Sequence, residues 1–322
     1  MRDFPAQYMG SEPAHRLPHR ALGPYRVAPI GYGAMRLTGP GVFGPPPDRD
    51  DAVQLLREAV EAGVDHIDTA EYYGPHVVNE LIRQALHPYS TELVLVSKVG
   101  ARRDDRGGIF AYDEPAQLRR GIEENLRTLD VDSVHVVNLR LMRASRPDSL
   151  FDDQLAAMTA ARDDGLIGAV GLSNVTLPHL LRALKSTEIA CVQNAYHPAD
   201  RSSQPVLEEC TRRGIAFVPF SPLGSGSQGV GSALGARGVL RVAARLDCSP
   251  AQVVLAWALR AAPNILLIPG TASRAHLREN LDAAKVTLDA DAGSGAVTSL
   301  TDGRAHHPVS ASRAYERGGA KH

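Results

Sequence analysis

The sequence lacks long apolar runs, cysteine pairs and an excess of charge of either sign. Its 322 residues include three cysteines, Cys191, Cys210 and Cys248, which are widely separated and form no CxxC pair. This spacing argues against a disulfide framework and against a structural zinc site, so we expect reduced thiols and no metal. The formal net charge of −1 gives no sign of a polyanionic partner, and no nucleic-acid partner is expected.

No stretch of the chain approaches the ~18 consecutive apolar residues that a membrane-spanning helix requires. The first 20 residues also contain no apolar run of the kind found in a secretory signal peptide. We therefore expect a soluble, cytoplasmic protein with no membrane partner. Residues 1–20 and 303–322 are polar and are expected to be disordered, whereas residues 21–302 contain no linker and are expected to form a single domain.

The sequence also lacks the G-x-G-x-x-G fingerprint that a dinucleotide-binding doubly wound sheet usually carries between its first strand and helix. After its first apolar segment it reads GYGAMRLTGPG, followed by a proline-rich loop. Eight short apolar segments instead alternate with amphipathic segments such as 50–63 and 114–129. Eight strand–helix units are typical of a closed (β/α)8 TIM barrel of the α/β class. The predicted strands are residues 27–34, 65–68, 93–98, 134–140, 167–173, 190–195, 215–220 and 264–270.

In such a barrel the chemistry lies at the carboxyl ends of the strands. Asp68 ends the second predicted strand, Tyr73 follows it closely, and Lys98 ends the third. A free tyrosine has a pKa of ~10, but a nearby lysine cation lowers that value by stabilising the phenolate. An aspartate paired with the lysine keeps it charged and oriented. The three residues therefore predict a general acid that protonates a carbonyl oxygen while hydride reaches the carbon.

At this point the sequence resembles the aldo-keto reductase family, over roughly residues 22–302. Each motif is weak alone, but together they occur in the family's order. Within the family the chain looks most like the bacterial pyridoxal reductases, which reduce pyridoxal to pyridoxine with NADPH, because of YGPHVVNELIRQAL and VVNLRLM. The motifs that carry the family resemblance are GYGAMRL, GVDHIDTAEYYG, VSK, VGLSNV, VQNAY, PFSPLG and IPGTASRAHLREN.

The resemblance implies a role at each matched position. Tyr73 matches the proton donor, and Asp68 and Lys98 match the pair that tunes it. Ser173, Asn174 and Gln193 match residues that hydrogen-bond the nicotinamide carboxamide, and Phe220 matches the ring that stacks on it. The other matched positions belong to the cofactor site: Ala34 and Met35 in GYGAMRL, Ser221, Leu223 and Gly224 in the pyrophosphate loop, and Gly270, Thr271, Ser273, Glu279 and Asn280 at the adenosine end.

The sequence departs from the family pattern at two positions. Arg140 stands at the end of the fourth predicted strand, where most members carry a catalytic histidine. Arginine stays protonated and cannot shuttle a proton, but it can donate a hydrogen bond to a carbonyl and stabilise negative charge, so we keep it among the catalytic residues. His276 stands where many NADPH-specific members have an arginine that meets the 2′-phosphate, and Arg274 or Arg278 could serve instead.

The sequence thus predicts an NADPH-dependent carbonyl reductase that acts on a small aldehyde or ketone, with pyridoxal as the preferred substrate and NADH as the alternative cofactor. One alternative is an aldo-keto reductase that tailors a natural-product or sugar carbonyl. An alternative of another class is a cofactor-binding regulatory barrel of the channel-subunit kind. Tyr72 is predicted to pack rather than react, and Arg102 and Arg103 are predicted to be solvated loop charges. The sequence indicates neither the oligomeric state nor the direction of the reaction in the cell.

Overall fold

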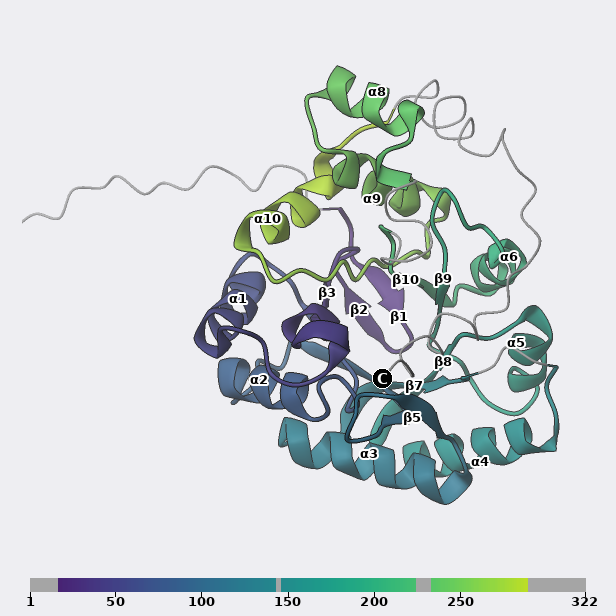
Figure 1. Cartoon of the computed structure of the whole chain (residues 1–322). Coiled ribbons are helices and arrows are strands. Elements are labelled where there is room, and N and C mark those ends of the chain that lie inside the picture. The colour runs from purple at the N-terminus through teal and green to yellow at the C-terminus, as the bar shows by residue number, and fades with distance from the viewer. Residues whose placement is uncertain (1–16, 143–145, 224–232, 289–322) are drawn as a thin grey trace, which may run out of the picture.

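The computed structural model describes residues 17–142, 146–223 and 233–288. The expected disorder of the two terminal segments falls largely outside these ranges and stays a prediction. A parallel sheet in the order β10-β9-β8-β7-β5-β4-β3 forms the centre, and Figure 1 shows the helices in a ring around it. The main strands are β3 (Tyr32–Gly33), β4 (His66–Asp68), β5 (Val94–Arg103), β7 (Val134–Arg140), β8 (Ile167–Ser173), β9 (Cys191–Ala195) and β10 (Ala216–Phe220).

The helices follow the strands in chain order, as the alternating pattern of the sequence predicts. Helix α8 packs its apolar face on α9 and lies outside the ring (Figure 1). The α-helices are α1 (Arg49–Glu61), α2 (Val77–Leu86), α3 (Pro115–Leu129), α4 (Ser149–Asp163), α5 (Leu177–Ala183), α6 (Gln204–Arg213), α8 (Arg237–Leu246), α9 (Pro250–Ala261) and α10 (Arg274–Asp282). Three short 3-10 helices are η1 (Ala34–Leu37), η2 (Pro40–Val42) and η3 (Ala283–Lys285).

The predicted eighth strand closes the barrel without forming a regular strand. Parallel bridges join Leu267 to Ile30 before β3 and Ile265 to Phe217 of β10. The amide of Gly31 donates to the carbonyl of Leu267 at 2.8 Å. Residues 264–268 thereby connect the two ends of the sheet, which removes its open edges. The prediction of a (β/α)8 barrel is confirmed, with a shorter eighth segment than expected.

The barrel wall separates two apolar layers, because side chains alternate between the two faces of each strand. Val94 and Val96 of β5 point into the barrel, where they pack with Val136 and Val218. Leu95 belongs instead to the larger core between the strands and the surrounding helices. The polar residues of the site therefore continue the inward-facing rows where those rows reach the carboxyl ends of the strands.

A hairpin that the sequence did not predict fills one end of the barrel. It consists of the antiparallel strands β1 (Arg20–Leu22) and β2 (Tyr25–Val27). Leu22 and Val27 are buried in the interior cluster of the barrel. The Arg20 guanidinium donates to the carbonyls of Ile265 and Leu259. Since these residues precede the first barrel strand, the hairpin closes the end opposite to the carboxyl ends.

The loop after the third predicted strand is also more ordered than the sequence indicated. β5 continues to Arg103 and pairs antiparallel with β6 (Ile109–Tyr112). Arg103 is buried and donates to the carbonyls of Tyr72, at 3.2 Å, and Gly107. The expectation of solvated loop charges was wrong for Arg103, because this guanidinium holds the loop that carries the tyrosines.

Candidate active site

Three neighbouring strands bring the predicted catalytic residues together. Asp68 is the last residue of β4, Lys98 lies within β5, and Arg140 is the last residue of β7. In the parallel register Asp68 is opposite Val96, so Lys98 lies two residues further along and on the same face of the sheet. Tyr73 follows β4 in the loop before α2.

The Asp68 carboxylate is clamped between two side chains from different sides of the barrel. The Lys98 ammonium donates to one carboxylate oxygen, and the Gln193 amide nitrogen of β9 donates to the other. Asp68, Lys98 and Gln193 are all buried. An ion pair shielded from water in this way holds its geometry more firmly than a surface pair, because bulk solvent does not screen it.

Lys98 connects this carboxylate to the tyrosine. Its ammonium also donates to the carbonyl of Thr69 at 2.9 Å and lies 5.1 Å from the centroid of the Tyr73 ring. Tyr73 itself is 8% exposed, at the border between the core and the barrel mouth. The arrangement places a cation over the ring of a phenol, and a nearby cation is a group that stabilises a phenolate.

Arg140 lies over the neighbouring tyrosine rather than over Tyr73. Its guanidinium carbon is 6.0 Å from the centroid of the Tyr72 ring, and one of its nitrogens contacts the Met142 sulfur. Tyr72 is 3% exposed, and its hydroxyl has no hydrogen-bond partner among the described residues. Burial raises the pKa of Tyr72, and the nearby Arg140 cation opposes that rise. Tyr72 thus packs as predicted, but its hydroxyl lies in the electrostatic range of Arg140.

The predicted carboxamide-binding residues lie side by side on the next strands. Ser173 of β8 is opposite Gln193 of β9, and the backbone N–H of Asn174 donates to the backbone carbonyl of Gln193 at 2.9 Å. Asn174 adopts a left-handed conformation with φ 58°, and its side chain donates to the Leu141 carbonyl at 2.7 Å. The Gln193 side-chain oxygen is buried without a partner in the described part of the chain. It is therefore a free acceptor at the floor of the site.

The predicted nicotinamide and pyrophosphate residues continue along the rim. Phe220 ends β10 and is half-buried, and Ser221 follows it in a left-handed conformation with φ 49°. A non-glycine residue in that region is strained, and such strain gathers at functional loops. Leu223 is the last described residue of this loop, and Gly224 lies outside the described residues.

The predicted adenosine-end residues lie just before α10 and within its second half. Thr271 is buried, its carbonyl accepts from the Tyr32 hydroxyl, and its side chain accepts from the Ser273 amide at 3.0 Å. Ser273 caps α10. Asn280 is buried and Glu279 is half-buried. Of the other two predicted cofactor positions, Ala34 is buried in η1 and Met35 is half-buried.

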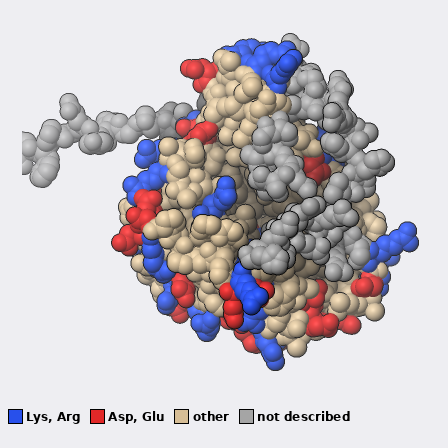
Figure 2. Space-filling model, in the orientation of Figure 1, with Lys and Arg blue, Asp and Glu red and all other residues tan. Residues whose placement is uncertain are grey.

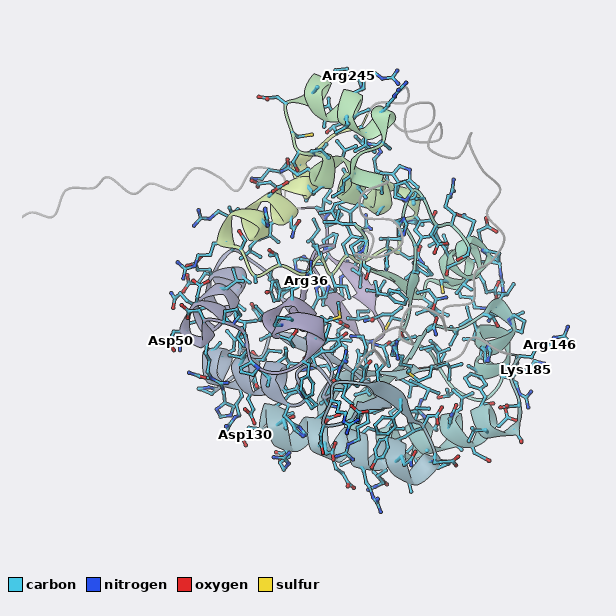
Figure 3. The ribbon with its side chains drawn as sticks, viewed as in Figure 1. Arg36, Asp50, Asp130, Arg146, Lys185 and Arg245 are labelled. Carbon is cyan, nitrogen blue, oxygen red and sulfur yellow. The ribbon has the colours of Figure 1, made fainter. Side chains whose placement is uncertain are left out.

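Gly270 links this region to the first strand. A β-carbon at this position would lie 2.5 Å from the carbonyl oxygen of Gly33, so only glycine allows the two segments to approach this closely. The same atom would lie 3.3 Å from the side chain of Arg36. Arg36 is exposed and stands near the middle of the face shown in Figure 3, whereas the other labelled residues lie at its periphery. The sequence prediction missed this cation, whose only signal was its place directly after Met35.

The structure separates the two arginines that could replace the missing 2′-phosphate arginine. Arg274 forms ion pairs with Asp51 at 2.7 Å and with Glu58 at 3.2 Å, so its charge is already neutralised by α1. Arg278 is exposed and forms no ion pair with any residue in the described ranges. Of the two, Arg278 is therefore the one whose charge is not paired within the described residues.

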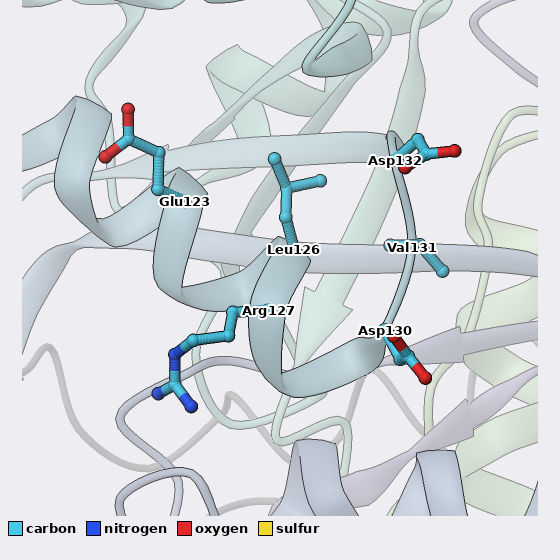
Figure 4. A pocket seen from close by; sticks show the side chains of 6 residues that line it. All are labelled: Glu123, Leu126, Arg127, Asp130, Val131 and Asp132. Atoms are coloured by element: carbon cyan, nitrogen blue, oxygen red, sulfur yellow. The ribbon is translucent and has the colours of Figure 1, made fainter.

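A separate hollow lies on the outer surface where α3 ends (Figure 4). Because α3 leads into the start of β7, this hollow is at the end of the barrel opposite to Asp68 and Lys98. No predicted site residue lines it. The lining residues are Glu123, Leu126, Arg127, Asp130, Val131 and Asp132.

The described residues contain neither a metal-binding cluster nor a membrane-spanning helix. No group of three or more His, Cys, Asp or Glu side chains within them is arranged to hold a metal ion. No helix in the described part of the chain has both the length and the apolar character needed to cross a membrane.

Known proteins resemble this chain in both sequence and structure. The model of the aldo/keto reductase family matches residues 29–294. A pyridoxine 4-dehydrogenase of Escherichia coli is 46% identical over 270 residues, which cover 83% of this chain and 93% of that protein. A thermostable aldo-keto reductase solved with the inhibitor epalrestat has a TM-score of 0.73 at 28% identity, with 88% and 99% of the two chains covered. An aldo/keto reductase of Klebsiella pneumoniae solved with NADP and acetate has a TM-score of 0.70 at 26% identity, with 85% and 92% covered.

Proposed function

Because the chain belongs to the aldo/keto reductase family, we propose that it reduces the aldehyde of pyridoxal to the alcohol of pyridoxine with NADPH. The observation that carries this proposal is the buried constellation of Asp68, Lys98 and Tyr73 at the mouth of the barrel. The likeness to a pyridoxine 4-dehydrogenase supports the choice of substrate, since oxidation of pyridoxine and reduction of pyridoxal are the two directions of one reaction.

Tyr73 is the proposed proton donor. When bound, NADPH supplies the hydride that adds to the carbonyl carbon. The Tyr73 hydroxyl gives its proton to the carbonyl oxygen, and the Lys98 ammonium stabilises the phenolate that remains. Asp68 keeps the ammonium in place, and Gln193 keeps Asp68 in place. A general acid positioned in this way contributes ~10²–10⁴ to the rate.

The residues of the site fit a nicotinamide cofactor. The free oxygen of Gln193 is an acceptor for the carboxamide N–H, with Ser173 and Asn174 beside it. Phe220 offers a ring at the strand end. Arg36, whose side chain lies near Gly270, and Arg278 of α10 are exposed cations that would hold the phosphates, which favours NADPH over NADH.

Arg140 is the proposed selector of the substrate. Pyridoxal carries an ionisable hydroxyl next to its aldehyde, and an arginine at the barrel mouth can pair with that oxygen while it also donates to the carbonyl. Arg140 ends β7, and its guanidinium lies against the Tyr72 ring and the Met142 sulfur. Arg140 would therefore replace the usual histidine as a hydrogen-bond donor and not as a proton shuttle.

Steady-state NADPH oxidation with a panel of carbonyls tests this proposal. We expect the highest kcat/KM for pyridoxal, lower values for simple aldehydes, ketones and sugars, and a clear preference for NADPH over NADH. A higher kcat/KM for a sugar or a polyketide-like ketone would support the tailoring alternative instead. No turnover on any carbonyl, together with tight NADPH binding, would indicate a regulatory barrel.

A further inference from the structure

A buried network of uncharged polar side chains lies on the helix side of the barrel wall, directly behind the Asp68–Lys98 pair. We call it the amide network. Its members are at most 3% exposed, although this interface is otherwise apolar. They come from the end of β4, from β5, and from the two helices that cover these strands: Thr69, Asn79, Ser97, Asn125 and Thr128.

The amide groups of Asn79 and Asn125 connect the two strands. The Thr69 hydroxyl donates to the Asn79 oxygen at 2.8 Å, and the Asn79 nitrogen donates to the Asn125 oxygen at 3.0 Å and to the Thr128 hydroxyl at 2.9 Å. The Ser97 hydroxyl donates to the same Asn125 oxygen at 2.5 Å. The Asn125 nitrogen donates to the Gly121 carbonyl at 2.8 Å, so the oxygen and the nitrogen of both amides have hydrogen-bond partners.

The position of the network in the sequence couples it to the catalytic pair. Thr69 directly follows Asp68, and Ser97 directly precedes Lys98. Because neighbouring side chains leave a strand on opposite faces, Asp68 and Lys98 point into the barrel while Thr69 and Ser97 point to the helices. The Thr69 carbonyl also accepts from the Lys98 ammonium at 2.9 Å. Anything that fixes Thr69 and Ser97 therefore fixes the ion pair.

We propose that Asn79 and Asn125 are positioning residues for proton transfer, which act through Thr69 and Ser97 to hold Asp68 and Lys98 against Tyr73. The inference rests on the proposed function. A buried hydrogen-bonded network rigidifies its surroundings, and its hydrogen bonds are directional where apolar packing is not. A catalytic group needs support of this kind to stay within about 0.5 Å of its productive position.

The test compares Thr69→Val with Thr211→Val. Each substitution replaces a hydroxyl by a methyl group and removes a 2.8 Å hydrogen bond to an asparagine oxygen. Thr69 bonds Asn79 in the amide network, whereas Thr211 bonds Asn264 far from the site. We expect Thr69→Val to lower kcat about tenfold with little change in the dissociation constant for NADPH, because Lys98 is held less firmly. We expect Thr211→Val to keep the wild-type kcat.

The pH profile of kcat separates positioning from general destabilisation. A loosened Lys98 stabilises the phenolate less, so the basic limb of the profile should move to higher pH in Thr69→Val and return in Thr69→Ser, which restores the hydroxyl. If Thr69→Val does not fold, Ser97→Ala replaces it and should move the limb in the same direction. An unchanged profile and kcat in the folded variant would overturn the inference. The proposed function fails separately, if Tyr73→Phe keeps full activity.

Discussion

Asp68 is the residue on which the hydrogen bonds of the site converge. Its carboxylate accepts hydrogen bonds from Lys98 on a neighbouring strand and from Gln193, which lies 125 positions further along the chain. The sequence predicted the Asp68–Lys98 pair because the two residues end consecutive strand segments. It did not predict the contact with Gln193, because nothing in a sequence shows which residues face each other across a closed barrel. Gln193 therefore has two proposed roles, one toward Asp68 and one toward the cofactor.

Replacement of Arg140 by leucine should change the choice of substrate more than the chemistry. A hydrogen bond to a charged partner contributes about 1.5–3 kcal/mol, so kcat/KM for pyridoxal should fall roughly 10–100-fold. The value for an aromatic aldehyde without the adjacent hydroxyl should fall much less. Steady-state kinetics with both substrates measure this, with Arg140→Lys as the variant that keeps the charge. Equal losses for the two aldehydes would contradict the proposed role of Arg140.

Glu71, which lies between Asp68 and Tyr73 in the sequence, should make stability depend on pH. Burial, with the nearby Glu124 carboxylate, raises the pKa of Glu71 from 4.5 to about 7. The folded state therefore keeps this proton between these values while the unfolded state releases it, so stability falls as pH rises from 4.5 to 7. Above about pH 7 the Glu71 carboxyl is ionised in the folded state as well, and its negative charge is then buried.

Glu71→Gln should remove this pH dependence. The variant is expected to match the wild type near pH 4 and to be more stable at pH 8, by on the order of 3 kcal/mol. Thermal unfolding across pH 4–8 measures the difference, and Glu61→Gln on the exposed end of α1 is the control. If both variants follow the same curve of melting temperature against pH, the Glu71 carboxyl does not carry the predicted proton.

At the scale of elements, the regular strands and helices were predictable and the supplementary hairpins were not. The long apolar segments 93–98, 134–140 and 167–173 became β5, β7 and β8, because a buried parallel strand is apolar on both faces. The strands β1 and β2 have three residues each and β6 has four, and such short segments do not show a clear alternation of apolar and polar residues. Their stability comes from tertiary contacts, such as those of Arg20 and Arg103, which a local pattern does not contain.

The β1–β2 hairpin should contribute to stability and not to catalysis. Leu22 is 1% exposed within the barrel core, and a buried Leu→Ala change costs about 2–5 kcal/mol. Leu22→Ala should therefore lower the melting temperature clearly while the kcat of the folded enzyme stays unchanged. Leu240→Ala, at a leucine that is 47% exposed, is the matched control and should change little. Equal melting temperatures for the two variants would show that the hairpin is not part of the core.

At the scale of the whole molecule, residues from most of the sequence come together on one rim of the barrel. Gly33 and Gly270 approach each other where the barrel closes, and Asp68, Arg140 and Gln193 lie on the strands between. Figure 2 shows charged side chains of both signs interspersed round the edge of this face. With a formal net charge of −1, the molecule has no large electrostatic field that would attract a polyanion. We therefore expect ligand selection to depend on individual cations, namely Arg36, Arg140 and Arg278.

The central claim is that Tyr73 donates the proton in an NADPH-dependent reduction of pyridoxal. The most direct test measures two quantities in Tyr73→Phe: the rate of NADPH oxidation with pyridoxal, and the dissociation constant for NADPH. We predict that kcat falls by at least ~10²-fold, because a phenyl ring has no proton to give, while the dissociation constant stays within about twofold of the wild type. Wild-type turnover in Tyr73→Phe, with NADPH bound normally, would contradict the claim.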